Sequence, residues 1–337
     1  MSKSALITGI SGQDGAYLSK FLLERGYEII GGDRRTASGS LWRLKELGIQ
    51  DKIQIVDLEL SEISNIDRIT KTYIVDEVYN LAAQSFVGAS FEVPLMTSDI
   101  TGLGVVRLLE SLRQNNPSAR FYQASTSEMF GKVQESPQSE KTKFYPRSPY
   151  GVAKLYAHWM TINYREAYDM FTCNGILFNH ESPLRGEEFV TRKICMGVSR
   201  ISNGDRNPIE LGNLSAKRDW GFAGDYVEAM WLMLQTDVPD DFVVSSGNNK
   251  SVKDFVEAAF KVINIDIVWR GNGEEEEGMC SKTKDILVKV NPKFYRPSEV
   301  HTLLGDSSKI NDKLGWSPKV NFESLVKMMV ESELKRL

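Results

Sequence analysis

A glycine-rich turn near the N-terminus constrains the fold of this chain more than any other stretch. The apolar run Ala5–Thr8 predicts a short buried strand, Gly9–Gly15 follows it, and Ala16–Arg25 has the pattern of a helix. Glycines permit a tight turn and a close approach of the backbone to a pyrophosphate, and a helix N-terminus attracts negative charge. Glycine spacing alone would also fit an ordinary turn. Strand, turn and helix together predict the first unit of a dinucleotide-binding fold.

Strands and helices alternate through the first half of the chain. Five further strands are predicted at Glu28–Gly31, Ile53–Val56, Glu77–Asn80, Arg120–Ser125 and Thr172–Leu177. The segment Pro94–Asn115 predicts a long helix whose apolar face consists of Leu103, Val106, Leu109 and Leu112. This alternation argues for an α/β fold with a Rossmann-type, doubly wound parallel sheet.

The pattern becomes less regular after about residue 180. Helices are predicted at Val190–Asn203, Gly224–Leu234, Val252–Ile263 and Phe322–Leu337, a strand at Phe242–Ser245, and a surface loop at Gly271–Gly278. No repeat or low-complexity linker separates the two halves. We therefore expect a dinucleotide-binding domain over residues 1–178, which elements near residues 217–246 rejoin, and a smaller substrate-binding lobe over residues 179–337.

Composition argues against several classes of protein. The formal net charge of −4 disfavours a general nucleic-acid binder, and no apolar run approaches the roughly 20 residues of a membrane span. Cys173, Cys195 and Cys280 lack a CxxC spacing, which favours reduced thiols, and the 3 histidines lie too far apart for a metal site. A strand begins almost at the first residue, so a signal peptide is not expected. We expect a cytoplasmic protein without a metal.

Two segments supply proton-handling side chains. Tyr150 and Lys154 are four residues apart and lie one turn from each other on one face of a predicted helix. An ammonium group so placed lowers the pKa of a phenol and makes it a usable base. Glu128 follows the strand Arg120–Ser125 and supplies a second acid or base. Two such groups beside one redox cofactor are what a multistep sugar reaction requires.

The ends of three predicted strands bear on which dinucleotide binds. At the end of the second strand, an acidic residue bonds a ribose 2′-hydroxyl, whereas arginine accepts a 2′-phosphate. Asp33 favours NAD, while Arg34 and Arg35 favour NADP, and a solvated charged loop is the alternative for each. The segments Asp57–Leu58 and Leu81–Ser85 are expected beside the adenine and the nicotinamide. We expect NADP.

The chain has a family resemblance that covers essentially its whole length. With Gly9–Gly15, Thr126/Glu128 and Tyr150/Lys154 identified, it resembles the extended short-chain dehydrogenase/reductases and, within them, the GDP-mannose 4,6-dehydratase family. The similar stretches are residues 8–18, 80–92, 121–131, 144–154, 175–194, 217–231 and 294–300. The glycine turn and the YxxxK motif are common to the superfamily. The stretches GQDG, NHESPLRG and KRDWGFAGDYVEAMW are far more selective for the family.

The resemblance implies roles for individual residues. Tyr150 would be the base, Lys154 its electrostatic partner, Thr126 a ligand of the sugar's 4-oxygen, and Glu128 the group that handles protons at C5 and C6. NADP would be held by Gly9, Ile10, Ser11, Gly12, Gln13, Asp14, Arg34, Arg35, Asp57, Leu58, Leu81, Ala82, Ala83, Gln84, Ser85, Lys154, His180 and Arg185. The GDP-sugar would contact Ser85, Asn179, Val190, Lys193, Arg218, Arg296 and Glu299.

The chain departs from the family pattern at a few positions. Asp33 stands where the family usually has a basic or an apolar residue, and Phe130 replaces a common tyrosine. Ser127 precedes Glu128, whereas dTDP-glucose dehydratases have Asp-Glu there. The last difference points to a GDP-sugar.

The implied reaction converts GDP-mannose to GDP-4-keto-6-deoxymannose by internal hydride transfer through bound NADP. One alternative is a related enzyme: a GDP-heptose 4,6-dehydratase, or a reductase or epimerase, which usually lacks a glutamate like Glu128. Another is a redox-sensing binding protein without catalysis, although such proteins tend to lose the tyrosine or the lysine. The resemblance also implies a homotetramer, with the loop Arg35–Arg43 reaching toward a neighbour's cofactor.

Overall fold

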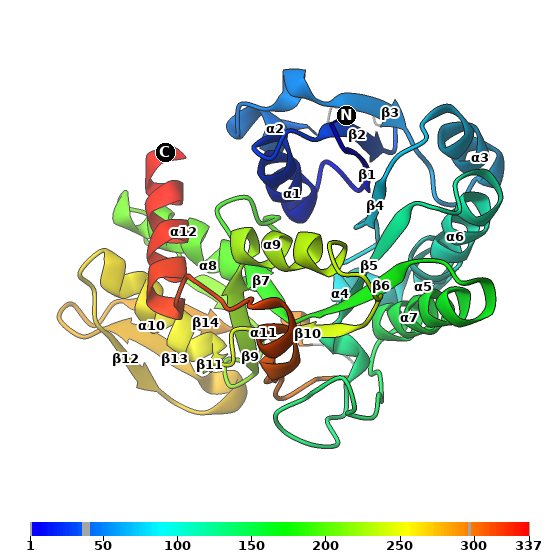
Figure 1. Ribbon diagram of the computed structural model, residues 1–337. Helices are drawn as coiled ribbons and strands as arrows, with labels where there is room; N and C mark the ends of the chain where they lie inside the picture. The colour runs from blue at the N-terminus through cyan, green and yellow to red at the C-terminus, as the bar shows by residue number, and fades with distance from the viewer. Residues whose placement is uncertain (1, 36–40, 296–297, 337) are drawn as a thin grey trace.

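The computed structural model describes residues 2–35, 41–295 and 298–336 and has an α/β fold (Figure 1). Within those ranges the strands form a seven-stranded, a four-stranded and a three-stranded sheet. The largest, called the central sheet below, is parallel throughout, with the order β10-β6-β5-β4-β1-β2-β3. Its strands are β1 (Ser4–Thr8), β2 (Glu28–Asp33), β3 (Gln54–Asp57), β4 (Glu77–Asn80), β5 (Arg120–Thr126), β6 (Thr172–Leu177) and β10 (Phe242–Val244). The predicted Rossmann-type sheet is confirmed.

Helices cover both faces of the central sheet (Figure 1). One face packs against α1 (Gln13–Leu23), α2 (Trp42–Glu46) and α9 (Ala223–Met233), and the other against α3 (Ile63–Thr72), α6 (Gly104–Asn115) and α7 (Pro149–Tyr168). Because successive strand residues point to opposite faces, Ala5 and Ile7 pack in the first core and Leu6 in the second. A strand that is buried on both faces explains the continuous apolar run that begins the chain.

The predicted helix Pro94–Asn115 is present, but its apolar face was predicted only in part. A π-helical turn at Asp99–Leu103 separates α5 (Pro94–Ser98) from α6. A π turn contains an extra residue, so it rotates the residues before it relative to those after it. The buried residues of α6 are Val105, Leu108, Leu109 and Leu112, whereas Leu103 is exposed and Val106 is only half-buried.

The C-terminal half contains a sheet that the sequence did not predict. β12 (Ile267–Arg270), β13 (Glu277–Cys280), β14 (Ile286–Val290) and β8 (Ile209–Leu211) pair in that order. The predicted loop Gly271–Gly278 is therefore wrong at its end, since Glu277 and Gly278 belong to β13. This sheet shares a core with α8 (Val190–Ser202), α10 (Val252–Val262) and α12 (Phe322–Arg336), which agree with predicted helices to within a residue or two.

The remaining elements connect these layers. β7 (Asn179–Glu181), β9 (Lys217–Phe222) and β11 (Asn249–Ser251) form the smallest sheet, and the other helical segments are Gln50–Lys52, α4 (Val87–Glu92), Ser127–Met129, Gly273–Glu275, Pro292–Phe294 and α11 (Ser308–Leu314). β10 extends the central sheet, while the division of the chain at residue 178 stays a prediction. No helix in the described part of the chain combines the length and the hydrophobicity that a membrane span requires.

Candidate active site

The carboxyl ends of the central strands bring most of the predicted site residues together. The chain leaves β1 toward one face of the sheet and leaves β4 toward the other, so a crevice opens between these neighbouring strands. Thr8 ends β1, and its Oγ1 donates to Asn80 Oδ1 at 2.7 Å and accepts from the N–H groups of Leu81 and Ala82, both at 3.1 Å. The predicted loop Leu81–Ser85 is therefore fastened to this crevice.

The turn Gly9–Asp14 is built for close backbone contacts. Gly9 has a φ of +69°, and a Cβ atom there would lie 2.9 Å from the Cα of Ala82, so only glycine fits without strain. α1 begins after Gly12, and no side chain in the described ranges caps it. Its first N–H groups are therefore available to a phosphate. The Ile10 side chain is buried in the core, so this residue offers only its backbone.

An ion pair links the glycine turn to the segment that follows β6. His180 Nε2 lies 2.8 Å from Asp14 Oδ2, and His180 Nδ1 lies 2.8 Å from the carbonyl oxygen of Phe178. Both partners only accept hydrogen bonds, so both ring nitrogens donate and the imidazole is protonated. Burial raises the pKa of Asp14 by itself, but His180 outweighs it and lowers this pKa to about 2. Burial opposes the charge on His180 too, yet Asp14 raises the pKa of the imidazole above its usual value.

Four further hydrogen bonds tie the same segments together. Ser182 Oγ donates to Gln13 Oε1 at 2.7 Å, and Gln13 Nε2 donates to the carbonyl oxygen of His180 at 3.1 Å. Arg43 Nη1 donates to the Ser11 carbonyl at 2.9 Å, and Arg43 Nε to the Leu184 carbonyl at 2.6 Å. Arg43 thus bonds to its own chain's glycine turn. The rest of the loop that was expected to reach a neighbour includes residues 36–40, which lie outside the described residues.

Arg185 lies at the edge of this segment. Its Nε is 3.1 Å from Glu181 Oε2 without hydrogen-bond alignment, and its guanidinium lies 3.5 Å from the ring centroid of Phe189. Thr191 Oγ1 donates to the same carboxylate oxygen at 2.6 Å. The carboxylate and the ring therefore fix the orientation of the guanidinium, whose planar set of donors suits a phosphate.

The ends of β2 and β3 carry the residues that were expected to read the adenosine ribose. Asp33 Oδ1 accepts from Ser11 Oγ at 2.9 Å, and the Asp33 carbonyl accepts from Leu58 N at 2.8 Å. Arg34 and Arg35 are exposed just beyond β2. The Asp33 carboxylate is thus turned toward the glycine turn, whereas the two guanidinium groups face solvent. Asp57 is exposed and Leu58 is buried.

The four predicted catalytic residues meet at the carboxyl end of β5. Thr126 ends the strand and accepts a hydrogen bond from Glu128 N at 3.2 Å, so the short turn that follows directs Glu128 back beside it. The Thr126 hydroxyl also lies close enough to the phenol of Tyr150 to favour a lower pKa of that group. Lys154 Nζ lies 5.9 Å from the centroid of the Tyr150 ring. All four side chains belong to buried residues, none more than 9% exposed.

The start of α7 fixes Tyr150 locally. Ser148 caps the helix by accepting from Gly151 N at 3.0 Å, and Pro149 occupies the first helical position, where its lack of an N–H has no cost. Tyr150 follows directly. The first turn of α7 is therefore well defined, and its phenol lies next to the end of β5.

The expected lowering of the pKa of Tyr150 is not met in this structure. Burial raises the pKa of this phenol above its usual value, and the largest opposing contribution is the Thr126 hydrogen bond rather than the charge of Lys154. Lys154 Nζ donates to the Ala124 carbonyl at 2.7 Å, and burial lowers the pKa of this amine to about 8. The reason is the dry surroundings, which disfavour the charged form of both groups.

The predicted sugar-binding residues extend away from the strand ends toward the C-terminal half. Arg218 Nη1 donates to the Val300 carbonyl at 2.7 Å, and its Nη2 lies 3.4 Å from Glu299 Oε1. Lys193 Nζ lies 3.4 Å from the ring centroid of Phe294. Asn179, Val190 and Glu299 are half-buried and Ser85 is exposed, while Arg296 lies outside the described residues.

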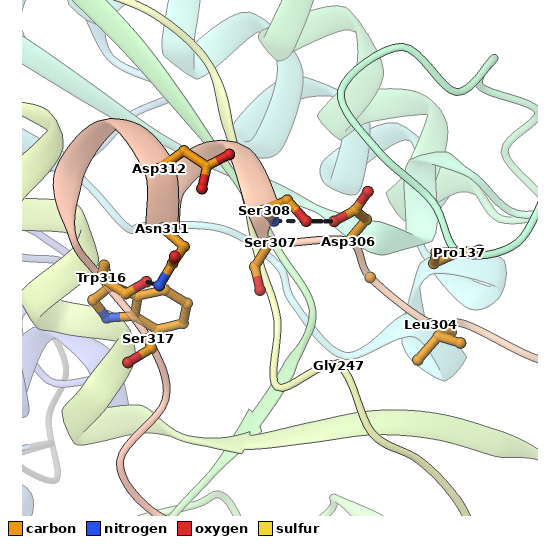
Figure 2. A pocket seen from close by; sticks show the side chains of 11 residues that line it. Pro137, Gly247, Leu304, Asp306, Ser307, Ser308, Asn311, Asp312, Trp316 and Ser317 are labelled. Atoms are coloured by element: carbon orange, nitrogen blue, oxygen red, sulfur yellow. Dashed lines mark hydrogen bonds between the residues drawn. The ribbon is translucent and has the colours of Figure 1, made fainter.

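Two cavities in the structure lie elsewhere. One, of about 410 Å³, is lined by Gly247, Asp306, Asn311 and Trp316 among others, beside α11 (Figure 2). The second, of about 470 Å³, lies at the opposite ends of β1, β4 and β5 beside Lys3. Neither contains a predicted site residue, so strand topology and side-chain contacts locate the candidate site. Among the described residues, no three His, Cys, Asp or Glu side chains are grouped to hold a metal ion.

Sequence reasoning did not select Ser125 and His158 as site residues. Their side chains bond each other behind Lys154, with His158 Nδ1 3.1 Å from Ser125 Oγ. One signal was available, since position 158 continues the spacing of Tyr150 and Lys154 by another four residues. That spacing alone equally fits a core histidine.

Comparison with known sequences gives one consistent family. The sequence profile described as GDP-mannose 4,6 dehydratase matches residues 6–329. The chain is 51% identical to the GDP-mannose 4,6 dehydratase of Cricetulus griseus over 99% of this chain and 92% of that protein. It is 50% identical to that of Homo sapiens over 98% and 91%, and 46% identical to that of Vibrio cholerae over 99% and 95% of the respective chains.

Solved structures share the fold at low sequence identity. A dTDP-glucose 4,6-dehydratase from Bacillus anthracis in complex with NAD has a TM-score of 0.81 and 22% identity, over 99% of this chain and 97% of that one. A UDP-glucose 4-epimerase from Thermotoga maritima with UDP-glucose has a TM-score of 0.83 and 23% identity, over 99% of both chains. RMD from Pseudomonas aeruginosa complexed with NADPH has a TM-score of 0.77 and 20% identity, over 99% and 100%.

Proposed function

Because this chain belongs to the GDP-mannose 4,6-dehydratase family, its reaction is the dehydration of GDP-mannose, and we propose that internal hydride transfer through bound NADP carries it out. The product is GDP-4-keto-6-deoxymannose, and the enzyme is a hydro-lyase. The observation that carries the proposal is the meeting of Thr126, Glu128, Tyr150 and Lys154 at the carboxyl end of β5. A reductase or epimerase would not need the buried Glu128.

The residues present fit a nicotinamide dinucleotide. The close contact between Gly9 and Ala82 and the uncapped start of α1 within the described residues suit a pyrophosphate that lies against the backbone. Gly9–Asp14, Asp57–Leu58, Leu81–Ser85, Lys154, His180 and Arg185 would hold this cofactor. When bound, it supplies a hydride acceptor at C4 of the sugar and returns the hydride at C6.

We propose NADP rather than NAD. Ser11 bonds the Asp33 carboxylate on the side of the glycine turn, which supports a role for this acid in ordering the turn. Arg34 and Arg35 are exposed where a 2′-phosphate would lie, and guanidinium groups bind phosphate oxygens two at a time.

Tyr150 removes the proton of the C4 hydroxyl in the first step. Burial disfavours the ionised form of the phenol, whereas the nearby Thr126 hydroxyl favours it. Lys154 is held by the Ala124 carbonyl with its Nζ 5.9 Å from the centroid of the Tyr150 ring, where it would stabilise a phenolate, and it would bond the cofactor's ribose. Thr126 remains available as a ligand of the sugar's 4-oxygen.

Glu128 performs the elimination. A ketone at C4 acidifies the C5 proton, and Glu128 removes it and assists the loss of the C6 hydroxyl as water. Glu128 gives that proton to the leaving hydroxyl, so the proton that returns to C5 after hydride has reached C6 is balanced by the one that Tyr150 took from the C4 hydroxyl. The side chain's burial beside Thr126 supports this role, because a general acid or base acts best when water is excluded.

The nucleotide end of the substrate lies along the C-terminal half in this proposal. Arg218 is held by the Val300 carbonyl and Glu299, and Lys193 by the ring of Phe294. Cations that are already oriented lose little freedom when they bind a diphosphate. Asn179, Ser85, Val190 and Arg296 complete the proposed set.

We also propose self-association, at least as a dimer and by the family resemblance as a tetramer. Exposed apolar side chains gather on α5, the π-helical turn and α7, namely Leu95, Met96, Leu103, Val152, Tyr156 and Trp159. These elements pack against each other and so present one face. A second copy of this chain can cover it about a two-fold axis.

A charge placed in that face tests the assembly. We expect Leu95→Glu to lower the molar mass measured by light scattering to that of a monomer, because a buried unpaired charge disrupts an apolar interface. Val238→Glu is the control, since Val238 is 73% exposed and Leu95 is 85% exposed. An unchanged mass for Leu95→Glu contradicts this interface.

We propose a cytoplasmic location as well. Cys173, Cys195 and Cys280 are buried and unpaired, as expected of a protein in a reducing compartment.

Product analysis tests the function. Purified protein with NADP is incubated with GDP-mannose and, separately, with other nucleotide sugars, and the products are identified by mass spectrometry. We expect loss of one water from GDP-mannose without added reductant. Absence of that product with cofactor present overturns the proposal. A faster reaction with a GDP-heptose would identify the GDP-heptose, rather than GDP-mannose, as the substrate.

A further inference from the structure

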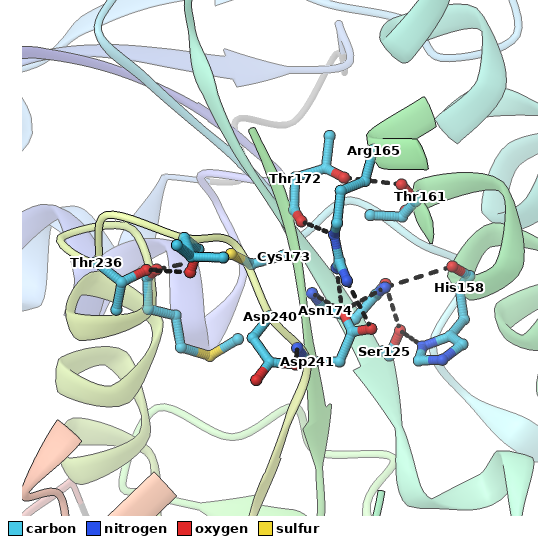
Figure 3. Close-up of polar contacts among 12 residues, drawn as sticks. Ser125, His158, Thr161, Arg165, Thr172, Cys173, Asn174, Thr236, Asp240 and Asp241 are labelled. Carbon is cyan, nitrogen blue, oxygen red and sulfur yellow. Dashed lines mark hydrogen bonds and ion pairs between the residues drawn. The ribbon is translucent and has the colours of Figure 1, made fainter. Parts of the chain in front are cut away.

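Successive turns of α7 are bonded to β5 directly behind the proposed catalytic residues. Lys154 Nζ donates to the Ala124 carbonyl at 2.7 Å. One turn later, His158 Nδ1 lies 3.1 Å from Ser125 Oγ (Figure 3). Tyr150, Lys154 and His158 are spaced by four residues and so lie on one helix face. His158 is 3% exposed, and among the described residues its ring contacts Ser125, Phe144 and Trp159.

The bonding partners of Asn174 determine the direction of this hydrogen bond. Asn174 Nδ2 lies 2.9 Å from Asp241 Oδ1 and 3.3 Å from the His158 carbonyl, both of which only accept. The amide oxygen of Asn174 therefore faces Ser125 Oγ, at 3.2 Å, and takes the single hydroxyl proton of Ser125. Ser125 can then only accept from His158. The imidazole must carry its proton on Nδ1.

The far end of the network is anchored by an ion pair. Arg165 bonds both oxygens of Asp241, with Nη2 2.5 Å from Oδ1 and Nη1 3.2 Å from Oδ2. Asn174 N on β6 donates to the same carboxylate at 2.8 Å, and Arg165 Nε donates to the Thr172 carbonyl at 2.7 Å. The network thus joins α7 to β5 and β6 (Figure 3). Burial lowers the pKa of His158 to about 4, so the end of the network at His158 is neutral at ordinary pH.

We propose that His158, as the neutral tautomer protonated at Nδ1, is a positioning residue that holds Tyr150 in place against Thr126. Two bonds from α7 to β5, those of Lys154 and His158, fix both the rotation of the helix and its position along the strand. Tyr150 stands one turn before Lys154, so its phenol follows any shift of the helix. This inference rests on the proposed function, because Tyr150 must be the base for its position to affect the rate.

Two substitutions separate the ring nitrogens. His158→Asn places an amide N–H where Nδ1 was, whereas His158→Gln places it near the former Nε2. We expect kcat of His158→Gln to fall roughly 10- to 100-fold, since a small misplacement of a catalytic group has effects of that order. KM for GDP-mannose should stay within about twofold, because the network does not touch the substrate, and His158→Asn should recover most of the lost rate.

Tyr164→Phe is the matched control. Tyr164 is also on α7, and its hydroxyl donates to Glu110 Oε2 at 3.0 Å, away from the catalytic end. The substitution removes one hydrogen bond from the same helix, and we expect an unchanged kcat. Equal rates for the wild-type protein, His158→Gln and His158→Asn overturn the proposal, as does an equal loss for both variants.

The tautomer itself can be measured without activity. The chain has only 3 histidines, so ¹⁵N spectra of their rings can be assigned by comparison with the His158→Asn variant. We expect the protonated nitrogen of His158 to be Nδ1, and protonation at Nε2 overturns the proposal even if the His158→Gln variant fails to fold. A wild-type protein that makes no product from GDP-mannose instead overturns the proposed function, which the spectra do not address.

Discussion

Two histidines lie near the candidate site, His158 buried and His180 half-buried, and their charges differ. His180 faces the Asp14 carboxylate and a carbonyl, so both ring nitrogens donate and its pKa is raised. His158 faces the Ser125 hydroxyl, and burial lowers its pKa to about 4. Burial disfavours the charged form of both. The partner therefore decides which histidine is charged, because only an anion repays the desolvation of an imidazolium.

The difference separates the cofactor side of the site from the catalytic side. The glycine turn is joined to the segment after β6 by a charged pair, which depends on pH. The helix that carries Tyr150 is joined to β5 by one hydrogen bond from Lys154 and one from the neutral His158. The hydrogen bond of His158 does not change near neutral pH. Substitutions on the catalytic side should alter the rate, whereas those on the cofactor side should alter affinity and stability.

The largest effect is expected from Glu128→Gln. The substitution keeps the size of this buried side chain but removes its ability to take the C5 proton, so we expect product formation to fall roughly 10²- to 10⁴-fold. Binding of GDP-mannose, measured by calorimetry, should change little. Glu135→Gln, in the exposed loop after the catalytic turn, is the control. A Glu128→Gln protein with normal turnover would favour the reductase or epimerase alternative.

Sequence reasoning succeeded where one local pattern determines the structure. The apolar run Ala5–Thr8 and the turn Gly9–Gly15 are sufficient for a strand and a tight glycine turn, because each residue's conformation depends on its immediate neighbours. The same holds for the pairing of Tyr150 with Lys154 on one helix face. These features were predicted within a residue or two, and the sheet that they imply is confirmed.

Sequence reasoning failed where the structure depends on helix irregularities, on the pairing of distant segments or on burial. The face of the helix Pro94–Asn115 was wrong at Leu103, because a π-helical turn in the middle shifts the register. The pairing of β8 with β14 joins segments almost eighty residues apart, and short runs such as Ile209–Leu211 carry no signal of it. Similarly, the pKa of Tyr150 depends on burial, which the spacing of Tyr150 and Lys154 cannot reveal.

An effect of intermediate size is expected in the pH dependence of stability, to which the pair of Asp14 and His180 contributes. Asp14 has a pKa of about 2 in the folded protein against an ordinary 3.8, so its contribution to stability is present above about pH 4 and is lost as the pH falls toward 2. His180 has a raised pKa, so its contribution is complete below its ordinary 6.5 and is lost as the pH rises through the raised value. The pair stabilises most between about pH 4 and about pH 6.5.

Asp14→Asn removes that contribution. We expect a loss in the free energy of unfolding on the order of 2 kcal/mol inside this window, and a smaller loss above it, as measured by urea unfolding across pH. Asp51→Asn, which changes an exposed carboxylate, should behave like the wild-type protein at each pH. A loss for Asp14→Asn that is the same from about pH 4 to about pH 9 would show that the charge of His180 does not matter.

The smallest effect is expected where the charges are exposed. Arg34 and Arg35 lie in solvent beyond β2, so water and salt screen them, unlike the pair of Asp14 and His180. We expect the double substitution Arg34→Ala/Arg35→Ala to weaken NADP binding roughly 10-fold and to leave NAD binding nearly unchanged, since only NADP carries the 2′-phosphate. The loss should shrink at high salt, which titration of the cofactor at two ionic strengths can measure. An equal loss for both cofactors would instead assign these arginines to the pyrophosphate, and no loss for either would remove them from the site.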